Sequence, residues 1–183
     1  VISLVKEAVD SSIESFVKID GGELSQAFSF KANGEDLVVR INNTDSGFLK
    51  DDYAYKHFAT PKLPIPKTIA LGPLNDTLFY SITEKMPGKI LDEYPTHEIA
   101  DVTDSIFETL DAIHGTPIDG QRFGDWDTSG EAGHASWRDH LLQLVKDNDR
   151  DLARGVTQDF LNQSTIAMLT EQFVSLVECC PEE

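Results

Sequence analysis

Residues 21–41 read GGELSQAFSFKANGEDLVVRI, and this stretch decides the fold. Apolar and polar side chains alternate along residues 24–32, which is the period of a β-strand. Asn33 and Gly34 follow, and this dipeptide readily adopts the two positive φ angles of a tight hairpin turn. The chain from Asp36 onward is therefore predicted to return as an antiparallel strand, forming a β-hairpin.

The return strand carries one cation among apolar residues. Leu37, Val39 and Ile41 fall on one face, so Val38 and Arg40 share the other. A cation there is suited to an anion, and the apolar neighbour is suited to a nucleotide base. The alternative is an edge arginine whose head reaches solvent while its stem packs on the sheet.

The remainder of the first 83 residues extends this pattern. One amphipathic helix is predicted before the Gly21-Gly22 turn, because apolar residues recur at three- and four-residue steps. Those residues are Ile2, Val5, Val9, Ile13 and Phe16. A second helix is predicted from near Ser46 to Ala59, before a proline-rich segment. Strands are expected over residues 67–71 and 77–83, joined by a turn over residues 72–76.

The second half is predicted to be helical. A helix is expected from an N-cap at Thr96 to a stop at Gly115. Beyond a Gly/Asp-rich loop, Gly120 to Gly133, helices are expected around residues 137–145 and 160–177. The whole second part is thus expected to be all α.

These elements define an α+β fold with an expected division into two lobes. Residues 1–83 form the predicted N-lobe, a small antiparallel β-sheet with helices. Residues 84–88, Glu-Lys-Met-Pro-Gly, form the predicted hinge. Residues 89–183 form the expected start of a helical lobe.

Charge is distributed unevenly along the 183 residues. The net charge is −17, which argues against nucleic acid or an anionic membrane as the main partner. Residues 1–91 carry 10 basic and 12 acidic side chains, whereas residues 92–183 carry 5 and 20. The acidic half either aids solubility alone or attracts a cationic substrate.

Several observations favour a cytoplasmic location. No apolar run approaches the roughly 20 residues of a membrane span, and the first residues do not have the order of a signal peptide. Cys179 and Cys180 are the only cysteines and are adjacent in sequence. This adjacency disfavours a mutual disulfide and is consistent with reduced thiols.

Several motifs together resemble the aminoglycoside phosphotransferase family. The resemblance runs from about Gly21 to the C-terminus, and its most specific parts are Phe28-Ser29-Phe30 and residues 50–59, KDDYAYKHFA. The other matching segments are Gly21–Phe28, Leu37–Arg40, Leu63–Pro66, Thr83–Gly88, Ile113-His114 and Trp137–Asp139. The resemblance implies a protein-kinase-like fold and ATP-dependent phosphoryl transfer.

The resemblance also implies a nucleotide site centred on Arg40. Arg40 would take the place of the strand-three lysine of protein kinases and contact the phosphates. Asp51 would orient this cation, although an acid near the start of a helix is also favoured by the helix dipole alone.

The adenine end of the implied site lies at the hinge. Ile82 would be the gatekeeper, and the Thr83 carbonyl and Lys85 amide would bond the adenine edge. Val38 would cover the adenine face. The amides from Gly22 to Ser25 would approach the phosphates, although Gly21-Gly22 also fits an ordinary turn.

Neither catalytic nor metal-binding residues are assigned within this sequence. The family's catalytic Asp and Asn, and the Asp that binds Mg²⁺, belong to a His-Gly-Asp-type loop and a later motif. No segment up to Glu183 fits either motif, so these residues are expected beyond Glu183, and the chain alone is expected to be inactive. The five histidines form no ligand-spaced cluster.

Two classes of function therefore remain. The first is an ATP-dependent phosphotransferase acting on a hydroxyl of a small cationic acceptor, with Mg²⁺ bridging the nucleotide phosphates. Macrolide, choline, fructosamine and homoserine kinases share enough of the layout to stay open. The second is a non-catalytic nucleotide-binding or interaction module, which the missing catalytic loop motivates.

Overall fold

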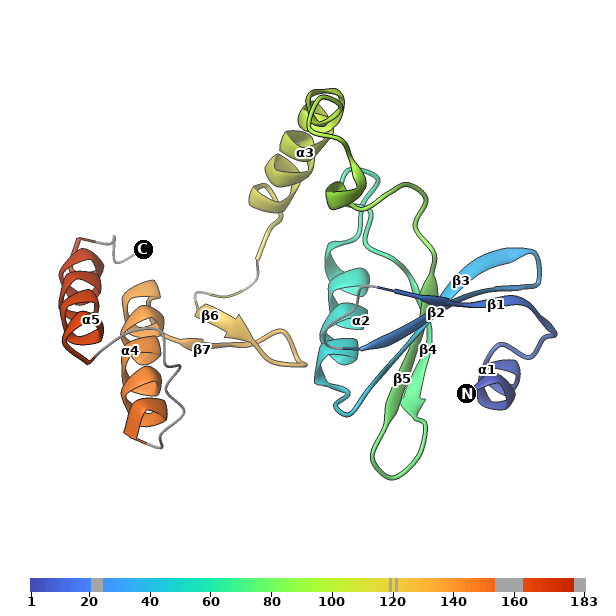
Figure 1. The fold of residues 1–183 in the computed structure, drawn as a ribbon, viewed down its shortest axis with the longest axis horizontal. Helices are drawn as coiled ribbons and strands as arrows, with labels where there is room; N and C mark the ends of the chain where they lie inside the picture. Colours follow the sequence, from blue (N-terminus) through green and yellow to red (C-terminus); the bar gives the residue numbers. More distant parts are fainter. Residues whose placement is uncertain (21–24, 119, 121, 154–162, 180–183) are drawn as a thin grey trace. The chain divides into compact units, whose positions relative to one another are not determined.

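A computed structural model describes residues 1–20, 25–118, 120, 122–153 and 163–179 (Figure 1). The chain divides into two compact units, Val1–Ile118 and Asp119–Glu183.

Unit 1 is built on a five-stranded antiparallel sheet in the order β1-β2-β3-β5-β4. The strands are β1 (Ile13–Ile19), β2 (Gln26–Ala32), β3 (Glu35–Asn42), β4 (Thr68–Pro73) and β5 (Phe79–Glu84). Its helices are α1 (Ile2–Ala8), α2 (Ser46–Phe58), the short 3-10 helix η1 (Leu91–Glu93) and α3 (Ile99–His114). The predicted α+β class and antiparallel sheet are confirmed.

The hairpin predicted from residues 21–41 is present as β2 and β3. Ala32 pairs with Glu35 across a two-residue turn. Asn33 has φ 53° and Gly34 has φ 81°, the positive values that the Asn-Gly dipeptide was expected to adopt. Register is thereby fixed at the turn, and one face of both strands enters the core.

The core lies between that face of the sheet and α1. Phe30 of β2, Val39 of β3 and Ile82 of β5 are at most 2% exposed, and Val5 of α1 packs with them. Helix α2 lies on the opposite side of the sheet from α1 (Figure 1). The face of β3 that carries Arg40 is therefore the face beside α2.

The prediction of one long first helix was wrong. Helix α1 ends at Ala8, Asp10 adopts φ 47°, and the chain then enters the sheet as β1. Strand β1 has a register shift between Glu14 and Val17, with Ser15 at φ 55°. This bulge puts Ile13 and Phe16 three residues apart on one apolar face, which imitates helical spacing.

The other predicted elements of unit 1 lie close to their expected positions. Helix α2 begins at Ser46, and β4 and β5 form the second hairpin. Helix α3 ends at His114 with the predicted stop, Gly115, as its C-cap, but its N-cap is Glu98 rather than Thr96. None of the residues of α3 is buried.

Unit 2 contains a hairpin that was not expected. Strands β6 (Phe123–Trp126) and β7 (Ala132–His134) pair antiparallel and precede α4 (Trp137–Ala153) and α5 (Gln163–Val177). The expectation of an all-α second part is therefore wrong. The predicted helix start at Phe160 lies outside the described residues. No helix in the described part of the chain is long and apolar enough to cross a membrane.

Candidate nucleotide-binding site

A pocket of about 430 Å³ opens on unit 1 beside the sheet. Three strands, α2 and two connecting segments contribute to its wall. The lining residues are Ile19, Val38, Arg40, Asp51, Ile65, Pro66, Thr83, Glu84, Lys85 and Met86. Five of the eight residues predicted for the nucleotide site are thus brought together in one pocket: Val38, Arg40, Asp51, Thr83 and Lys85.

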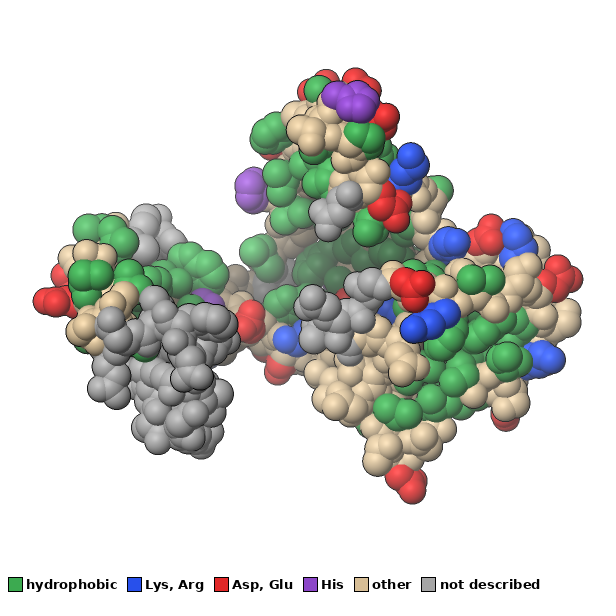
Figure 2. Space-filling view, in the orientation of Figure 1, with side chains coloured by type: hydrophobic (Ala, Val, Ile, Leu, Met, Phe, Trp, Pro, Cys, Tyr) green, Lys and Arg blue, Asp and Glu red, His purple; other side chains and the backbone are tan. Residues whose placement is uncertain are grey.

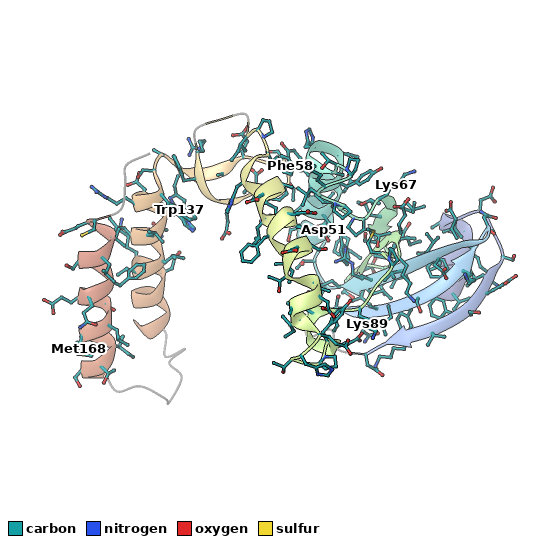
Figure 3. The ribbon with its side chains drawn as sticks, turned by 90° about the horizontal axis from the view of Figure 1, so that it is seen from above. Asp51, Phe58, Lys67, Lys89, Trp137 and Met168 are labelled. Carbon is teal, nitrogen blue, oxygen red and sulfur yellow. The ribbon has the colours of Figure 1, made fainter. Side chains whose placement is uncertain are left out.

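An ion pair links the sheet to α2 at this pocket. Nη2 of Arg40 donates a hydrogen bond to Oδ2 of Asp51 at 2.6 Å, and the two side chains are 34% and 49% exposed. Figure 3 labels Asp51 on α2. The Arg40 guanidinium also lies over the ring of Phe48, 5.3 Å from its centroid.

These contacts orient the cation rather than bury it. Ion pairs that remain this exposed add little to the free energy of unfolding, typically about 0–1 kcal/mol. A guanidinium held by a carboxylate and an aromatic ring nevertheless has fewer orientations open to it. Its remaining N–H groups are suited to bidentate pairing with phosphate oxygens.

Half of the residues that line the pocket are apolar. Val38 of β3 and Ile19 of β1 come from the sheet, Ile65 and Pro66 from the segment after α2, and Met86 from the segment after β5. An apolar wall beside an oriented cation matches the two chemical parts of a nucleotide, its flat base and its phosphates.

The backbone groups assigned to the adenine edge are used within the sheet. The Lys85 amide donates to the Asp36 carbonyl at 2.9 Å, extending the β3–β5 pairing by one residue. Hydrogen-bonded pairs alternate in an antiparallel ladder, so the backbone groups of Thr83 point toward Val38. The predicted roles of the Thr83 carbonyl and Lys85 amide therefore do not fit this structure.

Ile82 does not reach the pocket. It pairs with Val39 and is completely buried in the core on the α1 side of the sheet. Strand alternation instead puts Ser81 and Thr83 on the Arg40 face. Ile82 therefore does not line the pocket, and Thr83 and Glu84 are the β5 residues that do.

Of the two residues predicted to approach the phosphates, Gly22 and Ser25, the structure describes only Ser25. Gly22 lies outside the described residues. Ser25 is half-buried and does not line the pocket.

Sequence reasoning missed Ile19, Ile65, Pro66, Glu84 and Met86. Ile19 was missed because β1 itself was not recognised. Ile65 had a signal, an apolar residue between Pro64 and Pro66.

No metal-binding group is present in the described part of the chain. There, no three His, Cys, Asp or Glu side chains lie close enough together to hold an ion.

In unit 1, Lys31 donates a 2.9 Å hydrogen bond to Asp36, and this bond is the main cause that lowers the pKa of the Asp36 carboxyl.

The chain belongs to the phosphotransferase enzyme family known as APH, whose family model matches residues 15–174. It is 30% identical over 173 residues to hygromycin-B 4-O-kinase of Escherichia coli, covering 93% of this chain and 50% of that protein. The chain thus spans about half the length of this curated relative.

Solved structures of a related enzyme share the fold. A thermostable mutant of aminoglycoside phosphotransferase APH(4)-Ia, in ternary complex with AMP-PNP and hygromycin B, matches with a TM-score of 0.88 and 30% identity, over 100% of this chain and 61% of that one. A crystal structure of APH(4)-Ia matches with a TM-score of 0.87 and 29% identity, over 99% of this chain and 60% of that one. The predicted kinase-like fold is confirmed by this similarity.

Proposed function

We propose that these residues form the nucleotide-binding part of an ATP-dependent phosphotransferase that modifies a hydroxyl of a small cationic molecule. The observation that carries the proposal is the Arg40–Asp51 pair on the wall of an otherwise largely apolar pocket. The cation would contact the nucleotide phosphates, and Val38 would cover the base. The predicted lobes, residues 1–83 and 89–183 joined by a hinge over 84–88, are part of this proposal.

Related structures support a nucleotide as the ligand. Mutant forms of APH(4)-Ia are described in ternary complexes with AMP-PNP and with ADP, each together with hygromycin B. ATP is therefore the nucleotide proposed for this chain.

Charge supports an aminoglycoside-like acceptor. From Asp92 onward the sequence has 20 acidic and 5 basic side chains, an arrangement that attracts cations. Hygromycin B, which the related complexes contain, is the first acceptor to test. Resistance to such an antibiotic and a cytoplasmic location complete the proposal.

Mg²⁺ would supply charge neutralisation between the nucleotide phosphates when bound. The described residues of this chain offer no group of ligands for it, and no His-Gly-Asp-type loop occurs in the 183 residues. Within these residues, the proposed roles are to bind and orient the nucleotide. We expect the 183-residue chain by itself to bind ATP without transferring its phosphoryl group.

The proposal is tested by titrating AMP-PNP into the chain in a calorimeter. Arg40→Ala is expected to weaken binding by about tenfold or more, because hydrogen bonds from a charged donor to phosphate are lost. Lys56→Ala is the matched control: Lys56 also lies on the α2 side of unit 1 in a 2.6 Å ion pair, with Asp52, but outside the pocket. Equal affinities for the wild-type chain and Arg40→Ala would overturn the proposal.

A non-catalytic nucleotide-binding module is the second candidate, since the pocket of unit 1 would serve nucleotide binding equally well without a transfer step. The two candidates differ in one measurement on the natural protein that contains this sequence. Incubation with ATP, Mg²⁺ and hygromycin B should yield a phosphorylated product if the enzyme proposal holds. Nucleotide binding without product from any of a panel of aminoglycosides would favour the module.

A further inference from the structure

Two hydroxyl groups in the sheet of unit 1 are buried without a hydrogen bond. Ser81 of β5 is 0% exposed, and its Oγ has no partner among the described residues. The same is true of Oγ1 of Thr68 on β4. Most buried hydroxyls in proteins are hydrogen-bonded, so each exception calls for a physical reason.

Ser81 lies directly across the ladder from Arg40. The β3–β5 register pairs these two residues, so both side chains leave the sheet on the face beside α2. Thr68 lies on β4, across the ladder from Thr83, and is not paired with Arg40. Ser81 is thus the unsatisfied hydroxyl next to the cation.

Arg40 has donors to spare. A guanidinium carries five N–H groups, and within the described residues the only hydrogen bond from the Arg40 side chain runs from Nη2 to Asp51. When the guanidinium turns toward a phosphate, its plane must be fixed for two parallel hydrogen bonds to form. A neighbouring hydroxyl that accepts one of the other N–H groups would fix that plane.

We propose that Ser81 is a positioning residue for Arg40, unsatisfied in the free protein and hydrogen-bonded to the guanidinium when a polyphosphate is bound. The inference rests on the nucleotide site proposed above. An unsatisfied buried hydroxyl destabilises the folded state. Stability of the free protein therefore does not explain Ser81, whereas a hydrogen bond to Arg40 in the nucleotide complex does.

The proposal predicts opposite effects of Ser81→Ala on stability and on binding. The melting temperature of the free chain should stay the same or rise, since an unsatisfied polar group is removed. Affinity for ATP should fall by about tenfold, the usual effect of losing a hydrogen bond to a charged group. Affinity for adenosine should not change, because Arg40 would contact only the phosphates.

Thr68→Val is the matched control, since it removes the other buried, unpartnered hydroxyl and keeps its shape. It should leave both ATP and adenosine affinities unchanged. In an Arg40→Ala background, Ser81→Ala should have no further effect on ATP affinity, as expected for two residues that act as one unit.

Three results would overturn the inference. The first is an unchanged ATP affinity in Ser81→Ala. The second is an equal loss of ATP and adenosine affinity in this variant. The third is a loss of ATP affinity that is accompanied by a lower melting temperature, since general destabilisation would then explain it. Failure of the inference is distinguishable from failure of the nucleotide site. If Arg40→Ala weakens ATP binding and Ser81→Ala does not, only the inference fails; if the wild-type chain binds no ATP, both fail.

Discussion

The β2–β3 hairpin of unit 1 and the β6–β7 hairpin of unit 2 are held together in different ways. Strands β2 and β3 pair at seven positions through a two-residue Asn-Gly turn. Strands β6 and β7 have four and three residues, with a register shift between Phe123 and Trp126. The first hairpin contributes buried apolar side chains to the core of its unit, whereas both strands of the second are at most half-buried.

Polar side chains hold the second hairpin instead. Nε of Arg122 donates to the Ala132 carbonyl at 2.6 Å, and its Nη2 donates to the Gly133 carbonyl. In the turn, Oδ1 of Asp127 accepts the Ser129 amide at 2.8 Å. A hairpin can thus be specified either by alternation and burial or by side chains that bond the backbone.

Removal of a core ring should show the largest difference between the hairpins. Phe30 of β2 is 2% exposed, so Phe30→Ala should lower the free energy of unfolding of unit 1 by roughly 3–5 kcal/mol. Phe123→Ala in β6, where the ring is only half-buried, should lower that of unit 2 by less. Urea unfolding followed by circular dichroism measures the first.

Tryptophan fluorescence follows the second variant, because Trp126 and Trp137 are the only tryptophans and both lie in unit 2. Equal losses in the two variants would show that burial does not distinguish the hairpins.

Each hairpin has a glycine with a positive φ, and the surroundings predict different effects of a methyl group. At Gly124, φ is 96° and an added Cβ would lie 2.5 Å from Nδ1 of His140. Gly124→Ala should therefore destabilise unit 2 by roughly 2–4 kcal/mol, combining backbone strain with overpacking. At Gly34, φ is 81° with no atom within 4 Å of the added Cβ, so Gly34→Ala should destabilise unit 1 by roughly 1–2 kcal/mol.

Urea unfolding measures these effects, followed by circular dichroism for Gly34→Ala and by tryptophan fluorescence for Gly124→Ala. A Gly124→Ala variant as stable as the parent chain would mean that the His140 ring moves aside without loss of packing.

The same contrast explains which parts of the fold were predictable from sequence. The β2–β3 hairpin follows from local alternation and a turn dipeptide, and α2 from its periodicity and the prolines after it. Strand β1 was missed because its bulge at Ser15 breaks the two-residue period. Strands β6 and β7 were missed because strands this short contain hardly one period of alternation.

Prediction of the candidate site had a similar limit. Arg40, Val38 and Asp51 could be placed because they are fixed by the hairpin and the next helix. The backbone roles of Thr83 and Lys85 could not, since they depend on where pairing between β3 and β5 ends. The Lys85–Asp36 hydrogen bond, which extends this pairing, joins residues 49 positions apart and has no local signal.

Arg122 tests whether backbone-bonding side chains are what stabilise β6–β7. Arg122→Lys keeps the charge but lacks the planar fork that reaches two carbonyls. It should lower the free energy of unfolding of unit 2 by about 1 kcal/mol, as for one typical hydrogen bond. Fluorescence-detected urea unfolding measures the change, and Lys146→Arg on α4 serves as a charge-preserving control away from the hairpin. If Arg122→Lys and the control are equally stable, the hairpin does not depend on that fork.

Acid should distinguish the hairpins by the smallest effect. In β2–β3, Lys31 and Asp36 are cross-strand partners, and the hydrogen bond from Lys31 lowers the pKa of the Asp36 carboxyl below its ordinary value of 3.8. A carboxyl whose folded-state pKa is depressed stabilises the protein above its unfolded-state pKa, and this contribution is lost as the pH falls through the folded-state pKa.

Asp36→Asn should therefore slightly lower the melting temperature of unit 1 at pH 7 and make no difference in strong acid. Arg122→Lys removes no carboxyl group, so its effect on the melting temperature should be the same at both pH values. Calorimetric melting of the wild-type chain, Asp36→Asn and Arg122→Lys at pH 7 and in strong acid measures this contrast. If Asp36→Asn differs from the wild type as much in acid as at pH 7, Asp36 acts through something other than its charge.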